Sequence, residues 1–195
     1  MRTGTLRGLL TDDEIRIIRD NSQIYDRIFR LKNPVRGLAN CFGTVAHVLD
    51  FEWELLEYWR DALKKPEVNT RKENSDDVFL ERKMGPGYIG PLPMALFLTE
   101  SGKFAEIEKK EASNQVVAFF DECANSMGEK RLVHSGIYLG TFNETDIMFH
   151  KDGIGGRFGF MAVNCYAGLV YSYRGVRKYL REVKNMPVKF YRKAA

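Results

Sequence analysis

The sequence predicts an α+β protein in which N-terminal helices pack on a meandering antiparallel β-sheet. Apolar residues recur at helical spacing before residue 64, and short runs rich in β-branched and aromatic residues follow from residue 116. Helices that precede a run of strands are typical of the α+β class. The 195 residues, of which 44% are hydrophobic, suffice for one core, so a single domain over 1–195 is expected.

Two helices are expected in the first third of the chain. The first covers Thr11 to Leu31 and stops at Asn33-Pro34, because the residue before a proline disfavours helical backbone. The second covers Asn40 to Leu63, with Asn40 as an N-cap directly before Cys41.

The middle of the chain is expected to be irregular, apart from a short helix near Phe104 to Lys110. Residues 64–82 are polar and charged, and residues 84–93 hold too many glycines and prolines for regular structure. We expect the second stretch to cover the substrate cleft, with Tyr88 at the substrate; the alternative is that it patches the outside of the core. Its apolar side chains are Met84, Tyr88, Ile89, Leu92 and Met94.

The second half of the chain predicts the sheet. Gly, Asn and Asp separate four β-rich runs, and a helix near Val170 to Val183 precedes a last strand. The expected strands are 116–120, 132–139, 147–150, 158–163 and 188–192.

Composition excludes several classes of function. Thirty basic and 26 acidic residues leave a net charge of +4, too balanced for a nucleic-acid coat, so no specific nucleic-acid partner is expected. No apolar run approaches the roughly 20 residues of a membrane span, and the N-terminus lacks the apolar core of a secretory signal. Compartment and oligomeric state stay open. From Arg174 onward there are eight bases and one acid, which either bind an anionic partner or form a solvated face.

Cys41 is the candidate nucleophile. Three cysteines at wide spacing form neither a disulfide framework nor a paired zinc motif, and Cys123 and Cys165 are interpreted as small buried side chains. Cys41 begins a helix, where unpaired amides and the positive end of the dipole favour the thiolate and can receive an oxyanion.

Two of the three histidines are candidates for the base. His47 lies six residues after Cys41 and so on another face of the helix, where a structural role is expected. His134 and His150 lie on two consecutive predicted strands, which can bring the imidazoles together. One would take the thiol proton and the other would orient it.

These residues resemble the NlpC-type papain-like cysteine peptidases, which act on bacterial cell wall. The stretch from Val133 to Gly140 is similar to the family's strand with the base, the stretch from Ile147 to Gly153 to the strand with the third polar residue, and Asn40-Cys41-Phe42 to its helix-starting nucleophile. The resemblance covers about 38–193. It implies a papain-like fold and a catalytic triad of Cys41, His134 and His150.

The chain also departs from the family pattern. Asn40 replaces an aspartate that, in the branch that cuts murein stem peptides, helps to hold the substrate's free amine, so Asn40 is a candidate substrate-binding residue. Cys41 and His134 are 93 positions apart, which is more than the family's usual spacing. The excess matches residues 64–111, interpreted as an insertion that reshapes the cleft.

The sequence therefore predicts a cysteine amidohydrolase that needs no metal or other cofactor, with peptides such as murein fragments as its first candidate substrates. An acyltransferase or thiol esterase on the same scaffold is the alternative within enzymes. Two alternatives come from other classes: a binding module whose basic end engages an anionic polymer, and a zinc site built from Cys41, His134 and His150.

Overall fold

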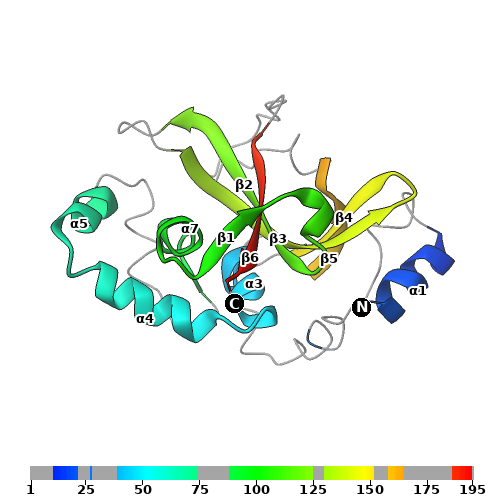
Figure 1. Cartoon of the computed structure of the whole chain (residues 1–195), viewed down its shortest axis with the longest axis horizontal. Coiled ribbons are helices and arrows are strands. Elements are labelled where there is room, and N and C mark those ends of the chain that lie inside the picture. The colour runs from blue at the N-terminus through cyan, green and yellow to red at the C-terminus, as the bar shows by residue number, and fades with distance from the viewer. Residues whose placement is uncertain are drawn as a thin grey trace, which may run out of the picture.

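The computed structural model describes residues 11–21, 27, 39–73, 88–124, 130–151, 158–164 and 186–194. These form an α+β fold around an antiparallel sheet, as predicted, and the sheet has six strands rather than the five expected (Figure 1). The strands lie in the order β1-β6-β2-β3-β4-β5. Their bounds are β1 Phe104–Ile107, β2 Gln115–Ala124, β3 Lys130–Phe142, β4 Thr145–Lys151, β5 Phe158–Ala162 and β6 Val188–Lys193.

The five predicted strands are confirmed, and four of them follow one another in the sheet through short connections. β2, β3, β4 and β5 pair consecutively as an antiparallel meander, and β6 returns to pair with β2. The predicted helix near 170–183 lies outside the described residues. The short helix expected near 104–110 is wrong: these residues form β1, which pairs with β6, and then the 3-10 helix Lys109–Glu111.

Helices α3 (Cys41–Val48) and α7 (Pro91–Glu100) both contact β3, and α4 (Glu52–Ala62) packs against α7. The remaining described helices are α1 (Asp12–Asn21) and α5 (Pro66–Glu73). Most of the predicted first helix beyond Asn21 lies outside the described residues. None of the described helices is long and apolar enough to cross a membrane.

The single helix predicted over 40–63 is wrong, because the chain turns between α3 and α4. Asp50 has a φ of 61°, which is left-handed backbone. The amide of Asp50 donates to His47 O and that of Phe51 to Ala46 O, the two hydrogen bonds of a Schellman helix end. The buried ring of Phe51 then anchors the turn in the core.

Described residues between 64 and 111 contribute to the core. The prediction of irregular structure over 64–82 is wrong where α5 lies, and the same prediction for 84–93 is wrong from Pro91, where α7 begins. A proline suits the first turn of a helix, where its missing amide proton has no partner to lose, so Pro91 begins α7. Met94, Phe97 and Leu98 of this helix are buried in the main core. The description of these residues as an insertion stays a prediction.

The two faces of the sheet pack differently. Successive side chains of a strand point to opposite faces, and the face that α3 covers, called the α3 face below, carries the main core. Its members on the central strands include Val116, Ala118, Ile137, Leu139, Ile147 and Phe149. A second apolar cluster lies on the other face, called the far face, and its members include Val117, Phe119, Tyr138, Met148 and Phe190.

Three of the eight basic residues in the C-terminal stretch lie on β6, and each forms an ion pair with an acidic residue of the chain. Lys189 lies 2.7 Å from Glu106, Arg192 3.6 Å from Glu111 and Lys193 2.5 Å from Glu54. These three charges thus serve contacts within the chain. The rest of the basic stretch, from Arg174 to Lys184, lies outside the described residues.

Candidate functional site

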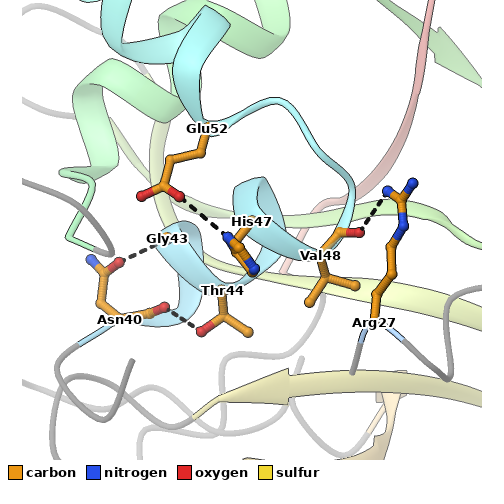
Figure 2. A network of polar contacts seen from close by, with 7 residues as sticks. All are labelled: Arg27, Asn40, Gly43, Thr44, His47, Val48 and Glu52. Carbon is orange, nitrogen blue, oxygen red and sulfur yellow. Dashed lines mark hydrogen bonds and ion pairs between the residues drawn. The ribbon is translucent and has the colours of Figure 1, made fainter. Parts of the chain in front are cut away.

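Cys41 is the first residue of α3, as predicted, and is 6% exposed. Asn40 caps the helix: its Oδ1 accepts a hydrogen bond of 2.9 Å from the amide of Gly43 (Figure 2). Its carbonyl accepts a second bond of 2.8 Å from the Thr44 hydroxyl. This cap fixes the first turn, so the thiol is held at the positive end of the helix dipole.

The Gly/Pro-rich stretch reaches this end of α3 through Ile89. The Asn40 side-chain amide donates to Ile89 O at 2.5 Å, and the amide of Ile89 approaches Asn40 Oδ1 at 3.4 Å. Ile89 is fully buried in the same core cluster as Cys41, and Tyr88 is half-buried. Both functional groups of the Asn40 side chain thus hold the chain itself. A role of Asn40 or Tyr88 in binding substrate stays a prediction.

Lys151 brings a buried ammonium to the same place. It ends β4, is 1% exposed, and its Nζ donates to the carbonyl of Ala39, two residues before Cys41. Burial lowers the pKa of Lys151, and the electrostatic interaction with Cys41 partly offsets this shift. A buried basic group needs hydrogen bonds and nearby negative charge. The carbonyl of Ala39 supplies a hydrogen bond, and this contact links the end of β4 to the turn that carries the nucleophile.

His134 and His150 lie together, as predicted. His134 Nε2 is 3.2 Å from His150 Nδ1, and both side chains are buried. Steric contact explains the glycine at position 136, two residues after His134. A Cβ on Gly136 would lie 2.9 Å from Phe149 O and 3.0 Å from Met148 Sδ. Gly136 therefore lets β3 and β4 approach closely beside the imidazole pair.

The histidine pair and Cys41 lie on different faces of the sheet. His134 pairs in register with Phe119 of the far face, and their rings are 5.8 Å apart. His150 follows Phe149 of the α3 face and precedes Lys151, so strand alternation turns it to the far face. The structure thus brings His134 to His150 but does not gather the predicted triad on one face.

Other sequence-based site predictions have plain outcomes. Among the described residues, no three His, Cys, Asp or Glu side chains gather as a metal site requires, so the zinc alternative gains no support. His47 lies 3.4 Å from Glu52, at the other end of α3 from Cys41 (Figure 2). The side chain of Cys123 and the whole of Cys165 lie outside the described residues.

Neither Lys151 nor Ser135 was predicted as a site residue. Ser135 Oγ is fully buried and has no hydrogen-bond partner among the described residues. Lys151 is in phase with Ile147 and Phe149 along β4, and this alternation places it on the buried α3 face. This alternation could have identified Lys151 from the sequence, because a lysine on the buried face of a strand needs a polar partner inside the protein.

Lowering the pH should destabilise the fold through His134. Burial and the neighbouring His150 hold the pKa of His134 well below its ordinary value of 6.5. The unfolded state therefore binds more protons below about pH 6.5, and the stability that is fully present above this pH is lost as the pH falls. Between about pH 7.5 and about pH 5.5 we expect a loss on the order of 1 kcal/mol in the free energy of unfolding, measured with urea. His134→Gln should show a smaller loss; an equal loss would contradict the assignment.

Comparison of the chain with protein-family models, curated proteins and solved structures gives no match.

Proposed function

We propose that the protein is a cysteine-dependent amidohydrolase with Cys41 as its nucleophile. The observation that carries this proposal is the position of Cys41 at the capped N-terminus of α3, beside the buried ammonium of Lys151. Helix amides, the helix dipole and a neighbouring cation are the three features that favour a protein thiolate.

The reaction would pass through a thioester. The Cys41 sulfur attacks the carbonyl carbon, an S–C bond forms, and the amine leaves with a proton as the C–N bond breaks. Water then cleaves the thioester to release the acid and restore the thiol. The backbone amide of Cys41 would donate to the oxyanion. Two groups are candidates to take the thiol proton: His134, oriented by His150, from the motif, and Lys151 from its position on the α3 face.

The substrate class and the papain-like fold enter this proposal through the NlpC-type motifs. They favour peptide amides, with murein fragments as the first candidates. Acyl transfer or thioester hydrolysis needs the same acyl-enzyme, so the proposed mechanism covers those alternatives. Assays with murein peptides, simple thioesters and oxyesters would rank them.

Selective alkylation tests the reactive thiol directly. Near neutral pH, iodoacetamide should modify Cys41 at least about ten times faster than the other two cysteines, because the thiolate is the nucleophilic form. Peptide mass spectrometry of the native protein identifies the modified residue, and urea-unfolded protein is the control, in which the three thiols should react alike. Equal or slower labelling of Cys41 in the native protein would speak against a reactive nucleophile.

A further inference from the structure

The end of β4 and the start of α3 meet through a backbone contact. Lys151 Nζ donates to Ala39 O, and Ala39 lies only two residues before the nucleophile. Ala39, Cys41 and Lys151 are all buried, so water screens little of the charge at this contact. The ammonium is therefore fixed beside the turn that carries the thiol.

The described surroundings of Cys41 are mostly apolar. α3 has no acidic residue in its first turn. The described core cluster that contains Cys41 adds two further titratable side chains, the phenols of Tyr58 and Tyr191. Burial raises the pKa of Tyr191, so this phenol stays neutral at ordinary pH. His134 and His150 face the other side of the sheet. Lys151 is buried and in electrostatic contact with the thiol, so it is the basic group that acts on Cys41.

Ser135 gives a second, independent sign of a binding position. Its buried hydroxyl lacks a hydrogen-bond partner among the described residues, which is unfavourable unless a bound group satisfies it. The register Ile137–Phe149, continued two residues along both strands, sets Ser135 beside Lys151 on the α3 face. A buried polar atom left in this state marks where a ligand can contact the protein.

We propose that Cys41 and Lys151 form a thiolate–ammonium pair, with the Ser135 hydroxyl as the hydrogen-bonding contact for the carbonyl group that reacts there. The pair forms when the Cys41 thiol gives its proton to the neutral Lys151 amine, so the ammonium described above is the product of this transfer. The sulfur becomes negative and the nitrogen positive, with no change in oxidation state. The helix dipole and the ammonium both stabilise the sulfur anion.

This pair assigns the proton acceptor to a residue to which the NlpC-type motifs give no role. A role of the Cys41–Lys151 pair in catalysis rests on the proposed function, whereas the pair itself can exist without that function. Lys151 acts on the nucleophile before substrate is bound, so the pair is measurable as ionisation of one thiol in the resting protein. His134 and His150 then serve the packing of the far face and the pH dependence of stability.

The test follows the ionisation of the Cys41 thiol through the ultraviolet absorbance of the thiolate. Cys41→Ala supplies the background from the other two cysteines. In the wild type, the midpoint should lie at least roughly one pH unit below the ordinary thiol value of about 8.5. Lys151→Met should raise the midpoint by roughly one unit or more, because the cation is gone. His134→Gln is the matched control on the other face and should leave the midpoint in place.

Two further variants keep the result interpretable. Lys151→Arg retains the charge and should retain most of the low midpoint, even if Lys151→Met fails to fold. Ser135→Ala should leave the midpoint unchanged and slow acylation by p-nitrophenyl acetate several-fold; an unchanged rate would remove Ser135 from the site. A midpoint that stays in place in folded Lys151→Met, or that moves equally in His134→Gln, would overturn the pair.

The outcome separates this inference from the proposed function. A low midpoint that depends on Lys151, in a protein that turns over no amide or ester, would uphold the pair and defeat the hydrolase proposal. Turnover that requires Cys41, with a midpoint independent of Lys151, would uphold the hydrolase and defeat the pair.

Discussion

Cys41→Ala should lower the turnover of any amide or ester substrate by on the order of a thousand-fold or more, because the acyl-enzyme can no longer form. The side chain is small and one atom is removed, so the fold should remain. The measurement is kcat on the best substrate from the assay series, together with mass spectrometry of the protein quenched during turnover. Wild-type protein should carry the acyl group on Cys41, and the variant should carry none.

The histidine variants are the informative comparison. The motif predicts that His134→Ala also abolishes turnover and that His150→Ala is milder, since water can partly replace an orienting group. If Lys151 takes the thiol proton, folded His134→Gln should retain most of its turnover. Near wild-type turnover in Cys41→Ala would end the nucleophile assignment, whereas an equal loss in Cys41→Ala and in folded His134→Gln would return the base to the histidine.

Phe51→Ala should lower the free energy of unfolding by about 3–5 kcal/mol. The ring is 1% exposed and lies against two others, 5.7 Å from Phe97 and 5.0 Å from Phe104 between centroids. Removal would leave a cavity where α7, β1 and the turn after α3 meet. Since small domains are stable by about 5–15 kcal/mol in total, the loss should shift the urea midpoint strongly.

Trp53 offers a matched control two residues away. Its side chain is 67% exposed, so Trp53→Ala removes an aromatic ring without opening a cavity. We expect a change within about 0.5 kcal/mol in the free energy of unfolding. Similar losses in the two variants would mean that Phe51 does not anchor the turn in the way its contacts indicate.

The sequence predicts local structure where one periodicity dominates. β3 and β4 were predictable because they are runs rich in β-branched and aromatic residues between turn-forming residues, and the start of α3 because Asn40 is a good N-cap. The end of α3 was not predictable from periodicity, since it depends on the left-handed backbone of Asp50. β1 was missed for another reason: its strand conformation comes from pairing with β6, far along the chain.

The candidate site shows the same division. The motif correctly indicates that His134 and His150 are neighbours, because register between adjacent strands is a local property. Which face of the sheet α3 covers is a property of the whole fold. His134 is out of phase with Ile137, and His150 with Phe149, so a helix on the face of those core residues leaves the imidazoles on the other.

The position of β6 has a consequence for how the chain reaches this fold. β6 fills the place between β1 and β2, although more than 60 positions of sequence separate it from the end of β2. The meander from β2 to β5 needs only short-range loops and can form early, whereas β1 finds its partner only once β6 has docked. Until then, β2 presents an open edge that can pair with another chain. Assembly should therefore be slow and sensitive to protein concentration, with aggregation as its competing reaction.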